Sequence, residues 1–322
     1  MTIVTAAELA RDARECLRFK RAMGIAHLRA ELVLNGFVRF VARHWGDHGK
    51  VKLDDAVTQW CTRIAGRKAV TVANEFGVVR QLCLYRRRRD PSSHVPEHAL
   101  ARVKESVFLP YIFSGDEVRR ILAAATSHHG RFIWASMLRT LILVLYCTGI
   151  RLGEAIRLRL GDIDLDRGLL MIQRSKGRAR IVTIRDDLVA ELHSYTADRQ
   201  KLNRECQPPD TDRFFLRLDG SPLTIQSAST AIRRLLRELG IKPPAGRVGA
   251  RPYELRHAFA VHRLTAWAEE GVDVHSRLPL LSAYLGHQNL VGTEVYLKAT
   301  PQLLELASNR FEQHLRDANP PR

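Results

Sequence analysis

Cysteine is scarce in this chain of 322 residues and shows no pairing pattern. The five cysteines are scattered, odd in number, and never form a C-x-x-C pair: Cys16, Cys61, Cys83, Cys147 and Cys206. A disulfide framework and a zinc module both depend on paired or closely spaced cysteines, so the pattern argues against each of them. It is typical of a protein in a reducing cytosol.

Long apolar runs are also missing. The longest strongly apolar stretch runs from Leu141 to Cys147, whereas a membrane-spanning helix needs about 20 apolar residues. The first residues, Met-Thr-Ile-Val-Thr, show no basic region followed by an apolar core, so no signal peptide is evident. We therefore expect a soluble intracellular protein that does not enter a membrane.

Two groups of catalytic motifs are absent. The chain has no H-E-x-x-H box, no carboxylate cluster and no Cys/His spacing that would indicate a metal site. It also lacks the G-x-x-x-x-G-K-[ST] box of nucleotide hydrolases. We expect neither a metal nor a cofactor, so any phosphoryl chemistry must be carried out by side chains.

Acidic residues are outnumbered, with 34 Asp and Glu against 51 Lys and Arg and a formal net charge of +17. Residues 1–110 carry 20 basic and 11 acidic residues, and the remainder carries 31 and 23. A basic excess of this size favours a polyanionic partner, of which nucleic acid is the commonest. Because both parts of the chain share the excess, we expect both to face the same polyanion.

The length and the hydrophobic pattern predict two domains. Residues 1–95 show apolar residues at helical spacing and are expected to form a helical N-terminal domain. Residues 96–111 are the predicted linker, because prolines and serines just before and within it interrupt any helix. Residues 112–322 form the predicted second domain, with a helix N-cap at Ser114.

The predicted fold class is mainly α with a small antiparallel β-sheet. Apolar residues between 162 and 184 indicate that sheet, with a hairpin turn at Ser175-Lys176-Gly177-Arg178. The pattern elsewhere in the second domain is helical, with helices expected at about 186–202, 224–239, 253–270 and 301–317.

Two arginine boxes, T-G-I-R-L-G-E and Y-E-L-R-H, stand out in the second domain. Arg151 follows a turn at the start of a helix, where backbone amides and the helix dipole favour an anion. Glu154 is placed to hold its guanidinium through a charge-assisted hydrogen bond. A lone arginine is more often an ordinary surface residue. Arg256 begins the helix of the second box, and its neighbour His257 is either structural or functional.

A histidine and a tyrosine follow these boxes. His287 belongs to an L-G-H box, and Tyr296 lies nine positions after it. Two guanidiniums, an imidazole and a phenol are what a metal-free attack on a phosphodiester needs, since the phenol can form a covalent phosphoester. Lys176 is either a solvated residue of a hairpin tip or a proton donor to a leaving oxygen.

Four consecutive arginines, Arg86 to Arg89, close the N-terminal domain. Four successive positions cover every face of a helix, so at most two of them can meet one DNA backbone. They are either a solvated run or phosphate contacts that position DNA without reading its sequence.

Taken together, these boxes resemble the tyrosine recombinase (phage integrase) family of site-specific DNA recombinases. The resemblance covers residues from about 112 to 300, and the helical N-terminal region is similar to the family's core-binding domain. Four boxes in the family's order and spacing make the match specific. The resemblance implies a helical core-binding domain followed by a mixed α/β catalytic domain.

The resemblance also implies a role for each site residue. Tyr296 would be the nucleophile, forming a 3′-phosphotyrosyl link and releasing a 5′-hydroxyl. Arg151 and Arg256 would clamp the phosphoryl oxygens, Lys176 would be the general acid, and His287 would hydrogen-bond the phosphate. The covalent link keeps the energy of the phosphodiester, so the strand would be rejoined without metal or ATP.

The chain departs from the family at Tyr253, where the family usually has histidine. A tyrosine hydroxyl donates and accepts hydrogen bonds. It is a poorer proton acceptor near neutral pH, because its reference pKa is about 10 against about 6.5 for histidine. We therefore regard Tyr253 as a candidate catalytic residue and do not transfer the histidine's role to His257. The long stretch between Arg256 and His287 resembles transposon-associated members.

We therefore expect an enzyme of a prokaryotic mobile element that breaks and rejoins double-stranded DNA, located in the cytoplasm on the nucleoid. It would act as a tetramer, either of this protein alone or mixed with a second recombinase. One alternative is a catalytically impaired DNA-binding accessory protein with the same fold, which only Tyr253 favours. Another is a type IB topoisomerase, which uses the same covalent step.

Overall fold

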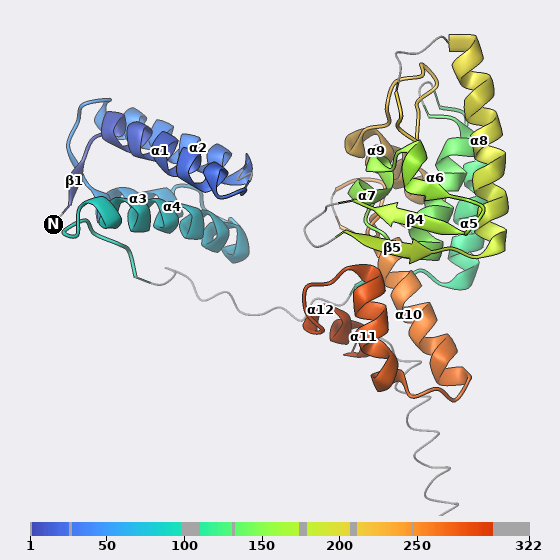
Figure 1. Cartoon of the computed structure of the whole chain (residues 1–322). Helices are drawn as coiled ribbons and strands as arrows, with labels where there is room; N and C mark the ends of the chain where they lie inside the picture. Colours follow the sequence, from blue (N-terminus) through green and yellow to red (C-terminus); the bar gives the residue numbers. More distant parts are fainter. Residues whose placement is uncertain are drawn as a thin grey trace, which may run out of the picture. The chain divides into compact units, whose positions relative to one another are not determined.

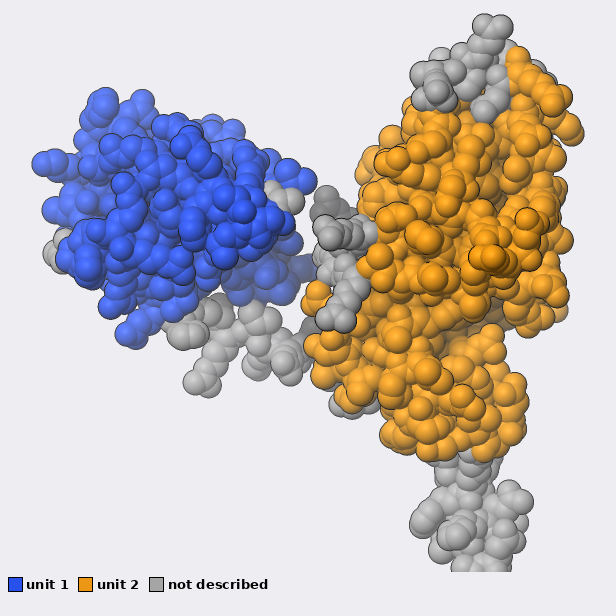
Figure 2. All heavy atoms as spheres, viewed as in Figure 1, with its two compact units in different colours: residues 1–107 blue, residues 108–322 orange. Residues whose placement is uncertain are grey.

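The chain divides into two compact units, residues 1–107 and residues 108–322 (Figures 1 and 2). The division falls within the stretch that the sequence assigns to a linker. The computed structural model describes residues 2–25, 28–97, 110–130, 133–173, 179–206, 211–246 and 248–298.

In its described residues, unit 1 contains four helices and one short antiparallel sheet. The helices are α1 (Ala6–Ala22), α2 (Leu28–Trp45), α3 (Leu53–Thr62) and α4 (Ala69–Arg89), and β1 (Ile3–Val4) pairs with β2 (Val51–Lys52). The Thr5 hydroxyl accepts from the Glu8 amide, and the Glu8 carboxylate accepts from the Thr5 amide, so a capping box starts α1. The hydrophobic pattern did not predict the two-residue strands, which are too short to show a periodicity.

The core of unit 1 is made by the apolar faces of its helices. Leu9, Phe37, Leu53 and Val79 come from four different helices and are fully buried. At about 25 cal/mol per Å² of apolar surface removed from water, such side chains are the main source of stability in a small helical unit.

Unit 2 is mostly helical with one three-stranded antiparallel sheet, which confirms the predicted fold class. The sheet has the order β3-β4-β5, with Leu169 opposite Thr183 and Ile172 opposite Arg180. Its strands are β3 (Ile163–Asp164), β4 (Leu169–Ile172) and β5 (Arg180–Thr183). The helices are α5 (Gly115–Thr126), α6 (Ala135–Thr148), α7 (Leu152–Arg157), α8 (Asp186–Cys206), α9 (Ile225–Glu238), α10 (Glu254–Glu269), α11 (Val274–Leu285) and α12 (Val291–Lys298), with a short 3-10 helix at Leu160–Asp162.

Helix α6 runs through the centre of unit 2 and ends at the first arginine box. It packs against α5, α8 and α10, and its Leu138, Leu141 and Ile142 are fully buried. The helix ends at Gly149, whose φ is +62°. A side chain there would also clash, because a Cβ would lie 2.5 Å from Phe259 and 2.8 Å from Leu285. The sharp turn at this glycine leads directly into Arg151.

Helices α10, α11 and α12 lie side by side at one end of unit 2 (Figure 1). They share a small apolar cluster that includes Val261, Leu264, Leu281 and Leu285, and Tyr296 belongs to it. The predicted hairpin turn at 175–178 and the predicted helix at 301–317 lie outside the described residues. No helix in the described ranges is long and apolar enough to cross a bilayer.

Candidate active site

Four of the predicted site residues meet where the α6–α7 turn approaches the α11–α12 turn. Arg256, from α10, donates to the carbonyl of Gly149 at 2.7 Å and to that of Leu285 at 2.8 Å. Arg151 donates to the Gly286 carbonyl at 3.4 Å. The rings of His287 and Tyr296 lie with their centroids 6.4 Å apart. Residues as far apart along the chain as Arg151 and Tyr296, which are 145 positions apart, thus form one site.

Glu154 is the buried anchor of this site. Its carboxylate accepts from Arg151 Nη1 at 2.9 Å, from the Arg151 amide at 3.0 Å and from Arg180 Nη2 at 2.9 Å. Burial raises the pKa of Glu154, but the hydrogen bonds and the charges of the two arginines outweigh burial and lower this pKa to about 2. The carboxylate is therefore ionised and holds both guanidiniums in place, as the sequence predicted for Arg151.

Arg180 is a site residue that the sequence did not identify. It opens β5, donates to the Tyr284 carbonyl at 2.8 Å, and packs so closely on Gly286 that a Cβ there would lie 2.7 Å from its Nη1. The sequence leaves Lys176 either solvated at a hairpin tip or a proton donor, and it assigns no role to Arg180. Nothing nearby in the sequence indicates that Arg180 turns inward, because its acidic partner belongs to a box 26 positions earlier.

The two arginines of the boxes differ in exposure. Only 1% of Arg256 is exposed, and burial, followed by the charge of Arg151, lowers its pKa. Both Nη atoms of Arg256 are held by backbone carbonyls, so its position is fixed. Arg151 is half-buried and lines an open hollow. Arg151 is consequently the arginine that a ligand in this hollow meets directly.

The hollow beside Arg151 has a volume of about 520 Å³. It is lined by Arg151, Gly286, His287, Gln288, Asn289 and Gly292. A guanidinium and an imidazole, with polar side chains beside them, are suited to a phosphate group. No carboxylate is among the lining residues.

His287 is held as a neutral imidazole. Burial lowers its pKa to about 4, and the charges of Arg256 and Arg151 act in the same direction. Its Nδ1 lies 2.8 Å from the hydroxyl of Thr293, which is fully buried. This contact orients the ring, so the site can offer a phosphate an imidazole of defined orientation.

Tyr296 is withdrawn from the hollow. Only 1% of it is exposed, and it does not line the hollow. Burial raises the pKa of its phenol to about 12, although the nearby Arg256 partly opposes this shift. In this structure the phenol is therefore protonated at neutral pH and packed within the α10–α12 cluster.

His257 is the second site residue that the sequence did not identify. Its Nδ1 lies 3.1 Å from the hydroxyl oxygen of Tyr296, and the two ring centroids are 5.4 Å apart. The sequence left His257 either structural or functional. Its neighbour Arg256 marks the box, but no residue of the box indicates that His257 faces a phenol 39 positions later.

Tyr253 lies at the N-terminal end of α10, beside His257, with ring centroids 4.8 Å apart. Tyr253 is 41% exposed, in contrast to the buried Arg256 and Tyr296. Its catalytic role stays a prediction. Lys176 lies outside the described residues. In the described part of the chain, no three His, Cys, Asp or Glu side chains gather as a metal-binding group.

Residues 112–302 match the model of the phage integrase family. The protein y4rB of Sinorhizobium fredii, an inferred integrase/recombinase, is 28% identical over 309 residues, which cover 94% of this chain and 97% of y4rB. The tyrosine recombinase XerA of Thermococcus kodakarensis is 32% identical over 203 residues, 63% of each chain.

Two solved structures share the fold. The Tn1549 transposon integrase in complex with transposon right end DNA has a TM-score of 0.69 at 16% identity, covering 95% of this chain and 99% of that one. The XerH site-specific recombinase bound to a palindromic difH substrate has a TM-score of 0.65 at 21% identity, covering 88% and 79%.

Proposed function

Because the chain belongs to the phage integrase family, it is a recombinase that breaks and rejoins DNA strands, and we propose that Tyr296 is its nucleophile. One observation carries the assignment. Arg151, Arg256, His287 and Tyr296 come from three separate boxes and meet beside a hollow suited to a phosphate.

In the proposed reaction, a scissile phosphate occupies the hollow. Arg151 binds its non-bridging oxygens, and the buried Arg256 adds positive charge that stabilises the transition state. His287 donates a hydrogen bond to the phosphate. The bond between the Tyr296 oxygen and phosphorus forms while the bond between phosphorus and the 5′ oxygen breaks. Lys176 is proposed to protonate the leaving 5′ oxygen.

Rejoining reverses these steps. The 5′-hydroxyl of a partner strand attacks the 3′-phosphotyrosyl link and releases the phenol, so no outside energy source is needed. Because Tyr296 is buried and outside the hollow, the first attack also requires its side chain to move. Tyr296 lies on α12, a helix of only eight residues that follows a glycine-containing turn.

A covalent-trapping assay tests this function. Duplexes that bind the full chain are first selected from a random pool, and a nick is placed near the centre of each recovered site. We expect wild type to form a protein–DNA adduct that survives denaturant. If wild type forms none on any bound site, the accessory-protein alternative is correct. Relaxation of a supercoiled plasmid lacking every recovered site would indicate a topoisomerase instead.

For unit 1 we propose a DNA-binding role. Of its four consecutive arginines, two form ion pairs within the unit and the other two are exposed. Arg86 forms an ion pair with Asp12, and Arg89 forms one with Glu15. These two arginines therefore join α4 to α1. Arg87 and Arg88 are exposed. Arg88 lies over the ring of Phe19, with its Cζ 5.8 Å from the centroid.

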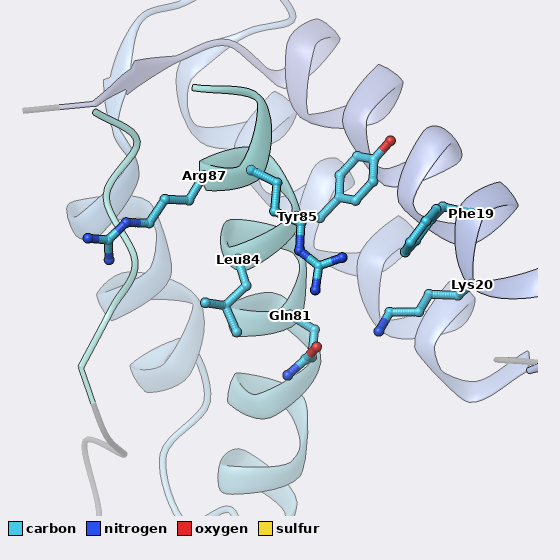
Figure 3. Close-up of a pocket in the computed structure, with 7 residues that line it drawn as sticks. Phe19, Lys20, Gln81, Leu84, Tyr85 and Arg87 are labelled. Atoms are coloured by element: carbon cyan, nitrogen blue, oxygen red, sulfur yellow. The ribbon is translucent and has the colours of Figure 1, made fainter. Parts of the chain in front are cut away.

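Arg88 also lines a hollow of about 370 Å³ between α1 and α4. Its other lining residues are Phe19, Lys20, Gln81, Leu84, Tyr85 and Arg87. Figure 3 shows Phe19, Lys20 and Tyr85 on one side of α4 and Arg87 directed to the other side. We propose that Lys20 and Arg88 bind one DNA phosphate here.

The double change Lys20→Ala with Arg88→Ala is expected to weaken binding of the full chain to duplex DNA several-fold. Each lost phosphate contact lowers the slope of log affinity against log salt by about 1. Fluorescence anisotropy between low and moderate salt measures both quantities. The double change Arg11→Ala with Arg14→Ala is the matched control, because both are exposed arginines of α1 that do not line this hollow. Equal losses in the two proteins would contradict the assignment.

We further propose that the recombinase serves a mobile element in a prokaryote, acting on nucleoid DNA in the cytoplasm as a tetramer. The Tn1549 integrase, which shares the fold, is a transposon enzyme. The two relatives named above come from Sinorhizobium and Thermococcus. Size-exclusion chromatography with light scattering on a recovered site would reveal the number of protomers.

A further inference from the structure

The proton on the Tyr296 hydroxyl must leave when its oxygen attacks phosphorus, and Arg151 and Arg256 are poorly suited to take it. A guanidinium is protonated throughout the range of a protein's pH and has no acceptor atom. His287 directs its Nδ1 at the Thr293 hydroxyl. Tyr253, which stands where the family usually has histidine, carries a phenol, and a phenol is a weak base near neutral pH.

His257 is placed differently. Its Nδ1 lies 3.1 Å from the Tyr296 oxygen, within the range for transfer of a proton between two heavy atoms. The ring is buried between Tyr253 and Tyr296, with centroids 4.8 Å and 5.4 Å away. This packing directs the imidazole at the phenol in its withdrawn position, and the contact must persist as Tyr296 moves toward the phosphate.

We propose that His257 is the catalytic base that accepts the proton of the Tyr296 hydroxyl during strand cleavage. The inference rests on the proposed function of Tyr296. The Tyr296 oxygen forms its bond to phosphorus, its proton passes to Nδ1 of His257, and the 5′ oxygen leaves with the electron pair of the broken bond. In the rejoining step His257 returns this proton to the departing phenol.

The charges around His257 make this role depend on the substrate. Burial lowers its pKa to about 4, and Arg256 of its own helix and Arg251 before that helix act in the same direction. Without DNA the imidazole is therefore neutral, as a base must be. A phosphate beside Arg256 would offset part of this positive charge and raise the affinity of His257 for a proton. Among the described residues, Tyr253, Tyr296 and His287 are further titratable groups near the ring.

The change His257→Asn tests the proposal, because an amide can keep a hydrogen bond near the Nδ1 position but cannot act as a base at neutral pH. His262→Asn is a matched control in the same helix. His262 also directs Nδ1 at a tyrosine hydroxyl, that of Tyr146 at 2.9 Å, but lies outside the site. Single-turnover cleavage of a nicked recovered site is measured for both variants and wild type, with DNA affinity and thermal melting confirming folded protein.

We expect His257→Asn to slow cleavage by about 10² to 10⁴-fold and His262→Asn to leave it within a few-fold of wild type. Rates near those of wild type in His257→Asn, or faster ones, would overturn the proposal. They would show that His257 only holds Tyr296 in its withdrawn position. If wild type itself forms no adduct, the proposed function fails rather than this inference.

A second measurement separates the base from the general acid. In a substrate with a 5′-bridging sulfur, the leaving thiolate needs no proton, so loss of a general acid no longer slows cleavage. We expect this substrate to restore the rate of Lys176→Ala but not that of His257→Asn. Restoration of His257→Asn would assign the histidine to the leaving group and contradict its role as base. If His257→Asn unfolds, His257→Gly with added imidazole replaces it, and no gain in rate with imidazole contradicts the proposal.

Discussion

Replacing Tyr296 with phenylalanine is expected to abolish the covalent protein–DNA adduct and to slow strand cleavage by about 10⁴-fold or more. Phenylalanine keeps the ring that packs within the α10–α12 cluster but lacks the attacking oxygen. The fold and the affinity for DNA should therefore survive. A denaturing gel of the trapped complex measures the adduct.

The control for this change is Tyr253→Phe, which removes a hydroxyl from a partly exposed tyrosine beside the same histidine. We expect it to retain the adduct, with a rate within about 10-fold of wild type, if Tyr253 contributes only a hydrogen bond. An adduct that persists in Tyr296→Phe and disappears in Tyr253→Phe would transfer the nucleophile to Tyr253.

The second large effect is expected at Glu154. Glutamine has nearly the same shape but no charge, so Arg151 and Arg180 would lose the carboxylate that binds both of them. Removing one partner of a buried ion pair lowers the unfolding free energy by about 3–5 kcal/mol. Cleavage should also fall by about 100-fold, because Arg151 would no longer be held in position.

Urea unfolding of the full chain, followed for the transition of unit 2, tests the effect on stability. Glu238→Gln is the matched control, since Glu238 pairs with Arg234 on the exposed surface of α9. Loss of this surface ion pair should change the unfolding free energy by no more than about 1 kcal/mol. Similar losses in both variants would show that Glu154 has no special structural role.

The pH dependence of stability follows from the same carboxylate. The pKa of Glu154 is lowered from 4.5 to about 2, so folding favours its ionised form. Its stabilisation is present above pH 4.5 and is lost as the pH falls toward 2. Glu154→Gln should therefore lose stability less steeply than wild type over this range, and an identical acid dependence would contradict the assignment.

Local signals made much of the fold predictable from the sequence. The N-cap at Ser114 and the turn at Gly149 depend on residues close together in the chain, and both are present. The roles of Arg180 and His257 were not predictable in this way. Each depends on a partner brought near by tertiary folding, Glu154 for the first and Tyr296 for the second.

The exposure of the proposed nucleophile could not be predicted from the sequence either. The nine-residue spacing after His287 predicts Tyr296 for this role, but it does not show whether the phenol faces the phosphate or the core. That depends on how α12 packs against α10 and α11, and in this structure Tyr296 is buried with them. The same packing places its hydroxyl beside His257.

The central claim is that Tyr296 becomes covalently attached to DNA. Its most direct test is mass spectrometry of the trapped wild-type adduct after nuclease and protease digestion. We predict a nucleotide linked through its 3′-phosphate to Tyr296. A nucleotide on another residue, such as Tyr253 or Tyr284, or an adduct linked through a 5′-phosphate, would contradict it.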